Sequence, residues 1–66
     1  MRSDLLMNCI WFDEMTPEEL ADALELTPEA LFRKIFGDDA FSEEEIRRIM
    51  MLLGLDENDA ERIFFA

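Results

Sequence analysis

The sequence predicts an all-α protein of five short helices. Three observations support this prediction: a helix-start pattern that recurs along the chain, apolar residues at helical spacing, and a glycine just after two of the helices. The chain of 66 residues is long enough for a single small domain, residues 1–66, and such a domain buries only about 60% of its unfolded surface. Nearly every helix must therefore contribute apolar side chains to one core.

The helix-start pattern is clearest in MTPEEL, where Thr16 can cap a helix that begins at Pro17 and Glu19 can complete a capping box. The pattern recurs in LTPEAL and FSEEEI, and more loosely in LDENDA, with caps at Thr27, Ser42 and Asp56. These caps predict helices over residues 4–12, 17–24, 28–36, 43–53 and 57–65. Gly37 and Gly54 follow the third and fourth helices, where a left-handed residue often closes a helix.

Apolar residues recur every three or four positions and are expected to face one shared core. They are Leu5, Leu6, Cys9, Ile10, Leu20, Ala21, Leu24, Leu31, Ile35, Ile46, Ile49, Met50 and Leu53. Cys9 is expected to be an inert buried thiol, and Trp11 and Phe12 to be partly buried. We expect Ile63, Phe64 and Phe65 to cover the core; the alternative is that they pair two copies in a homodimer.

The charge balance is strongly negative, with 17 acids, 6 bases and a formal net charge of −11. Such a field repels nucleic acid and favours basic partners, although acids also serve solubility. One cysteine and no histidine allow neither an internal disulfide nor an ordinary zinc site, which indicates a reducing, cytoplasmic setting. The apolar run IMMLLGL is far short of the roughly 20 residues that span a membrane, so no membrane association is expected.

Catalytic chemistry has little basis in the sequence. There is no histidine or tyrosine, no glycine-rich phosphate loop, and no Ser or Cys beside a plausible base. The segment DENDA lacks the ligand spacing and central glycine of an EF-hand loop. We therefore expect a protein that is not an enzyme and that uses no cofactor or metal.

The short segment ELT between the second and third helices forces these helices to cross steeply, as in a helix-turn-helix over residues 17–36. Together, MTPEELADALELTPEALFRKIFG, FSEEEIRRIMMLLGL and RIFFA resemble the small phage-type Cro and repressor-like proteins with a lambda-repressor-like helix-turn-helix domain. The resemblance covers nearly the whole chain. It implies a transcriptional regulator that binds operator DNA, with the third helix in the major groove. The matching DNA-contact positions are Thr27, Glu29, Phe32, Arg33 and Lys34.

Around these positions the chain departs from the pattern, because residues 37–45 hold five acids and no base, and Glu25 stands where the family usually has glycine. The alternative is an acidic protein of the same fold that mimics DNA and inhibits a basic nucleic-acid-binding protein. Its acidic face would comprise Glu18, Glu19, Asp22, Asp38, Asp39, Glu43 and Glu44. Acids in first turns also stabilise helices, by about 0.3–1 kcal/mol each. Operator binding would require Arg33, Lys34, Arg47 and Arg48 to share one face, clear of carboxylates.

Overall fold

Five α-helices form the regular structure of residues 1–65, which is the part of the chain described by the computed structural model. They are α1 (Ser3–Phe12), α2 (Pro17–Ala23), α3 (Pro28–Phe36), α4 (Glu43–Leu53) and α5 (Glu57–Phe64). No strand occurs among these residues, and none of their helices is long and apolar enough to cross a membrane. The predicted all-α class is confirmed, with every predicted helix end within one residue of the observed one. Ala66, the last residue of the predicted domain, lies outside the described residues.

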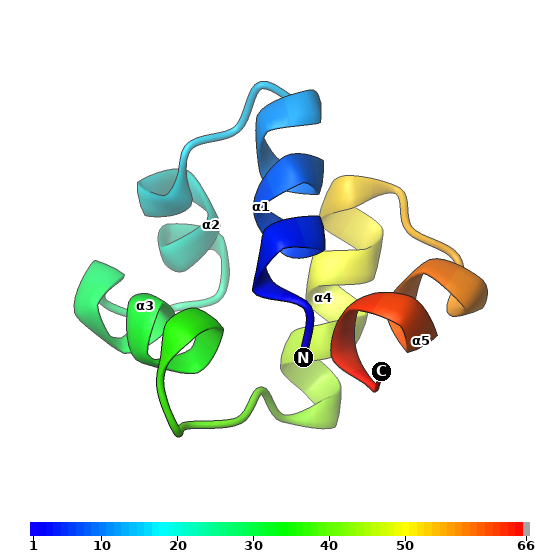
Figure 1. Cartoon of the computed structure of the whole chain (residues 1–66). Helices are drawn as coiled ribbons and strands as arrows, with labels where there is room; N and C mark the ends of the chain where they lie inside the picture. Colours follow the sequence, from blue (N-terminus) through cyan, green and yellow to red (C-terminus); the bar gives the residue numbers. More distant parts are fainter. Residues whose placement is uncertain (66) are drawn as a thin grey trace.

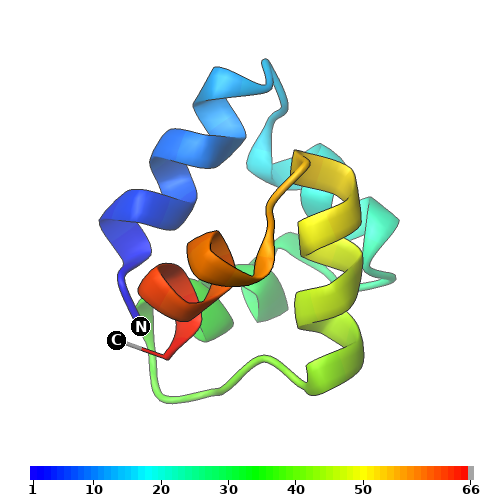
Figure 2. The same ribbon diagram turned by 90° about the vertical axis from the view of Figure 1, so that its right-hand side faces the viewer.

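The helices surround one core, with α1 between the α2–α3 pair on one side and the α4–α5 pair on the other (Figure 1). Seen from the side, α5 lies in front of the space between α1 and α4 (Figure 2). The Arg2 N–H donates a hydrogen bond to the Ile63 carbonyl oxygen at 2.7 Å, so the start of α1 is joined to the end of α5. Helices from the two ends of the chain thus form one face of the molecule.

Side-chain caps fix where the helices begin. Thr16 Oγ1 accepts the Glu19 N–H at 3.1 Å, and Glu19 Oε1 accepts the Thr16 N–H at 3.0 Å, which completes the predicted capping box of α2. Equivalent boxes start α4 and α5, with caps at Ser42 and Asp56. Caps of this kind contribute about 1 kcal/mol each, and they account for the accuracy of the predicted boundaries.

The core is formed by the predicted apolar stripe together with α5. Its buried residues are Leu6, Ile10, Leu20, Ala21, Leu24, Leu31, Ile35, Ile49, Leu53, Ala60 and Ile63. The predicted residues Leu5, Cys9, Ile46 and Met50 are only half-buried, at the margin of the core. At the end of the chain, Ile63 fills the core and Phe64 packs edge-to-face on Phe41 with ring centres 5.8 Å apart, whereas Phe65 is exposed.

The prediction of partial burial for Trp11 and Phe12 is wrong, because these side chains are 60% and 88% exposed. The buried residues of α1 are Leu6 and Ile10, one helical turn apart. Residues 11 and 12 are rotated away from that line by the helical repeat of 3.6 residues per turn. Two large aromatic side chains therefore lie on the surface at the end of α1.

The two glycines have different roles. Gly54 ends α4 in the left-handed conformation, with φ 64°, as predicted. For Gly37 the same prediction is wrong, since φ is −110° and ψ is −153°. A Cβ atom at Gly37 would lie 2.8 Å from the Arg33 carbonyl oxygen, so glycine is required there by close approach of the main chain.

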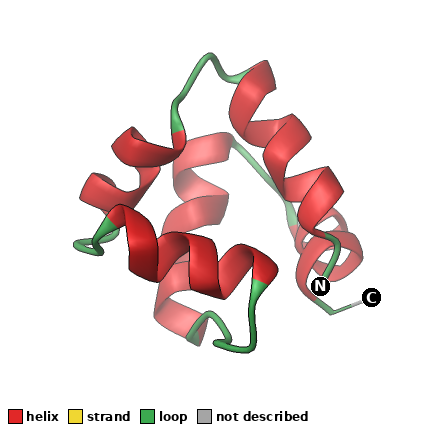
Figure 3. Cartoon of the chain, turned by 60° about the vertical axis from the view of Figure 1, so that its left-hand side comes forward, coloured by secondary structure: helices red, strands yellow, loops and turns green. Residues whose placement is uncertain are grey.

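The turn between α2 and α3 adopts a left-handed conformation without a glycine. Glu25 has φ 59°, and the next residue, Leu26, donates its N–H to the Ala21 carbonyl oxygen at 2.8 Å. Figure 3 shows α3 running across the front of the molecule directly below α2. The backbone thus takes the glycine-like conformation of the turn although a side chain is present.

Replacing Glu25 by glycine should stabilise the protein, because an L-residue in the left-handed region costs about 1–2 kcal/mol and the extra entropy of glycine offsets only part of this. We expect Glu25→Gly to raise Tm by about 4 °C in thermal denaturation followed by circular dichroism. Glu25→Gln is the control, since it removes the same charge and keeps the side chain in the turn. A lower Tm for Glu25→Gly than for Glu25→Gln would contradict this account.

Candidate functional site

The exposed side of α3 carries most of the residues for which the sequence predicts DNA contacts. Thr27 Oγ1 caps the helix by accepting a main-chain N–H of the first turn at 3.1 Å. Glu29, Phe32 and Arg33 are exposed to solvent, and Phe32 and Arg33 follow Glu29 by three and four residues. The structure therefore brings three of the five predicted contact residues to one side of α3, with Thr27 exposed at the start of the helix.

Lys34 is the exception, because its ammonium group is held within the chain. Nζ donates hydrogen bonds to Glu45 Oε1 and to the Ala40 carbonyl oxygen, each at 3.1 Å, and lies 5.9 Å from the centre of the Phe41 ring. The side chains of Lys34 and Glu45 are only 19% and 17% exposed. Glu45 Oε1 also accepts the Ser42 N–H at 2.8 Å. The hydrogen bonds of the ammonium group thus join α3 to the α3–α4 loop and to the start of α4.

Two arginines also lie beside carboxylates of the same chain. Arg48 Nη2 is 3.1 Å from Glu44 Oε1, and its Nη1 is 3.9 Å from Glu25 Oε2. Arg33 Nε is 3.9 Å from Asp39 Oδ2, in a more exposed pair. These contacts cancel much of the positive potential that a phosphate group would meet near α3 and α4.

Arg47 differs from these cations, since within residues 1–65 it makes no ion pair. It lies on α4 beside Met50, Met51 and Leu55, which line a shallow apolar hollow. Among residues 1–65, Arg33, Lys34 and Arg48 each lie within 4 Å of a carboxylate, and Arg47 does not. The four basic residues therefore do not form the carboxylate-free positive patch that operator binding would require.

The predicted acidic residues are all exposed, and they come from three parts of the chain. Glu18, Glu19 and Asp22 lie on α2, Asp38 and Asp39 lie in the α3–α4 loop, and Glu43 and Glu44 start α4. In Figure 3, α2 lies above α3 and the α3–α4 loop lies below it. Asp22 lies on α2 and Asp38 lies in the loop. Within residues 1–65, the side chains of both make no hydrogen bond or ion pair. Negative charge thus flanks α3 on both sides.

An exposed aromatic pair lies on α3 between these acids. The rings of Phe32 and Phe36 stack with centres 6.2 Å apart and planes 20° apart, and the two residues are 41% and 62% exposed. Phe32 is one of the contact residues predicted from the sequence, whereas Phe36 was not predicted. Their spacing of four residues on one helix is the signal that would have revealed the pair. An exposed aromatic centre with a charged margin is typical of a surface that contacts another protein.

The environment of Glu45 favours its charged form. Burial alone would raise the pKa of this carboxyl group, but the hydrogen bonds from the Ser42 main chain and from Lys34 outweigh that effect and hold the pKa below its ordinary value. The carboxylate is therefore a partner for Lys34 over the whole physiological pH range.

The acids of the described residues do not form a metal site, because no group of three or more His, Cys, Asp or Glu among residues 1–65 is arranged to hold an ion. Comparison of the chain with protein-family models, with curated protein sequences and with solved structures found no match. The resemblance to Cro and repressor-like proteins thus rests on the sequence pattern, and the function has to be argued from the surface of the molecule.

Acid should weaken the link between α3 and α4. Because the pKa of Glu45 is lowered in the folded protein, its contribution to stability is present above the unfolded pKa of about 4.3 and is lost as the pH falls through the folded pKa. We expect urea denaturation between about pH 6 and pH 3 to show a flatter loss of stability in Glu45→Gln than in the wild type. Glu43→Gln is the matched control, as it removes one charge from the same turn without touching Lys34. Equal pH profiles for the two variants would contradict this role of Glu45.

Proposed function

We propose that this chain is an acidic helix-turn-helix protein that binds the basic surface of a nucleic-acid-binding protein in place of DNA. One observation carries the proposal: Arg33, Lys34 and Arg48 lie 3.9, 3.1 and 3.1 Å from carboxylates of the same chain. A DNA-binding surface requires these cations to be available to phosphate. Here they are paired within the chain, whereas many surrounding acids have no such pair among residues 1–65.

The arithmetic of phosphate binding supports this proposal. Proteins that bind DNA strongly neutralise about six to ten phosphates, and each neutralised phosphate contributes through the release of counterions. The chain has 6 bases in total: Arg2 precedes α1, and the others are spread over α3, α4 and α5. With a net charge of −11, long-range electrostatics oppose the approach of DNA and favour the approach of a basic protein.

The proposed contact surface combines the aromatic pair on α3 with the acids around it. Phe32 and Phe36 would supply the apolar anchor, and the acids on α2 and in the α3–α4 loop would face the partner's arginines and lysines. Asp22 and Asp38 make no side-chain hydrogen bond or ion pair within residues 1–65. Binding of a partner's cation to them therefore breaks no existing contact. We propose a cytoplasmic setting for this activity, and the presence of a single cysteine supports it.

Operator binding is the second candidate function, and the α2–α3 unit favours it. The helices are joined by a short turn, and Thr27 and Arg33 are exposed on α3, where a recognition helix presents such side chains. In this candidate the chain is a phage-type transcriptional regulator, and Arg33 exchanges its exposed partner Asp39 for a base or phosphate.

The two candidates differ in their response to duplex DNA. We expect fluorescence anisotropy with a random-sequence duplex at low salt to show no binding up to about 100 μM, since non-specific binding by DNA-binding proteins falls near 10⁻⁴ to 10⁻⁶ M. In the same assay, the chain should displace the duplex from a linker histone, used as a basic probe. Duplex binding that weakens with salt and is lost in Arg33→Ala would instead establish the second candidate.

Specific recognition has to be separated from simple charge attraction. Phe32→Ala should weaken competition for the histone by about tenfold without changing the net charge, because it removes an aromatic anchor. Met51→Ala is the matched control, as Met51 is a similarly apolar and 84% exposed residue on α4. Equal competition by both variants would show that the aromatic pair takes no part in binding.

A further inference from the structure

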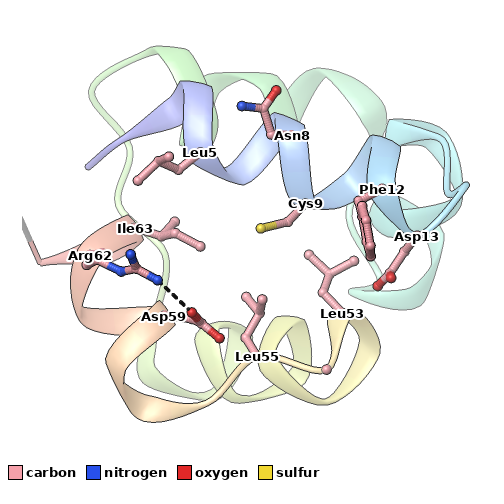
Figure 4. A pocket seen from close by; sticks show the side chains of 11 residues that line it. Leu5, Asn8, Cys9, Phe12, Asp13, Leu53, Leu55, Asp59, Arg62 and Ile63 are labelled. Carbon is pink, nitrogen blue, oxygen red and sulfur yellow. Dashed lines mark hydrogen bonds and ion pairs between the residues drawn. The ribbon is translucent and has the colours of Figure 1, made fainter.

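A second apolar surface lies on another face, between α1 and the segment that joins α4 to α5. It is a groove of about 610 Å³, a volume within the range of pockets that bind ligands. Cys9, Leu53, Leu55 and Ile63 point into it from three helices and the α4–α5 turn, and Phe12 stands at one end (Figure 4). The 88% exposure of Phe12 leaves an aromatic side chain beside this groove with most of its surface in water.

The charged groups at the margin of the groove are mainly negative. Asp13 and Asp59 line it, and Arg62, the lining cation, is bound by Asp59 at 3.0 Å. Burial is the main cause that raises the pKa of the Cys9 thiol. The negative charges of Asp59 and Asp13 raise this pKa further, and the positive charge of Arg62 lowers it by a smaller amount. A ligand with an apolar face and adjacent positive charges is therefore complementary to the groove in both polarity and charge.

A second copy of the chain matches it poorly. Each copy carries a net charge of −11, and a symmetric pairing of the two grooves would bring Asp13 and Asp59 of both copies together. A helix with an apolar stripe and basic flanks meets both requirements, since its apolar residues fill the groove and its lysines reach the marginal acids.

We propose that the groove between α1 and the α4–α5 segment is a docking site for a basic amphipathic helix of a partner protein. Phe12 is the aromatic anchor of this site, and Asp13, which makes no ion pair within residues 1–65, together with the net charge of −11 favours a cationic occupant. The site is separate from the acidic surface around α3 and does not depend on the function proposed above.

The test uses two synthetic peptides of about 14 residues, each with leucines at helical spacing. The other positions are lysine in one peptide and glutamate in the second. We expect calorimetric titration to detect binding of the lysine peptide only. Phe12→Ala should weaken this binding by about tenfold, whereas Met51→Ala, which alters an exposed apolar residue that does not line the groove, should leave it unchanged.

Cys9 reports whether the peptide occupies the groove, because it is the only cysteine in the sequence and it lines the floor. A saturating amount of lysine peptide should slow alkylation of Cys9 by about tenfold or more at alkaline pH. Peptide that binds without protecting Cys9 has docked elsewhere and overturns the proposal. Absence of binding, equal binding of the glutamate peptide, or unchanged binding to Phe12→Ala overturns it as well.

A second copy of the chain could also occupy the groove. Analytical ultracentrifugation of the chain without peptide detects such self-association. A dimer in which Cys9 is already protected would assign the groove to a second copy and overturn the proposal. A monomer that binds the lysine peptide in the groove supports it. Failure of the histone competition would leave this result untouched, so the two functional proposals can fail independently.

Discussion

The ammonium group of Lys34 lies where α3, the α3–α4 loop and the start of α4 meet, and this contact organises one side of the molecule. Lys34 bonds to Glu45, which also closes the capping box of α4, and to the carbonyl oxygen of Ala40 in the loop. A largely buried, hydrogen-bonded ion pair is costly to break from one side, because the remaining charge is left without a partner. The contact that joins the two helices therefore also removes a cation from the surface of α3.

Negative charge has two roles in this chain, and the structure separates them. Glu19, Glu45, Asp56 and Asp59 complete capping boxes, so these acids stabilise the helices that they begin. Asp22 and Asp38 are exposed and, within residues 1–65, make no such contact. Capping allows a small domain to remain folded at a net charge of −11, while the uncommitted acids give its surface a preference for basic partners.

The sequence predicted local features of the fold well, because local features depend on neighbouring residues. The helix boundaries follow from caps such as Thr16 and Ser42, and the buried stripe follows from helical spacing. Two features were not predicted from the sequence. The role of Gly37 depends on an extended backbone conformation that brings it close to the carbonyl oxygen of Arg33, and the exposure of Phe12 depends on which side of α1 packs against the core. The candidate site divides in the same way. Glu29, Phe32 and Arg33 share the exposed side of α3 as helical spacing requires. The pairing of Lys34 with a residue of α4 and the groove beside α1 arise only from packing.

The central claim is that the chain uses its own carboxylates to neutralise the cations near α3. Lys34 is the only lysine in the sequence, so its reaction with an amine-reactive ester, followed by mass spectrometry, measures the claim at one atom. The account predicts that Nζ is modified about tenfold or more slowly in the folded chain than in the urea-unfolded chain, and that Glu45→Gln removes much of this protection. Equal rates in the folded and unfolded chains would show that Lys34 is free to meet an external phosphate, and would contradict the account.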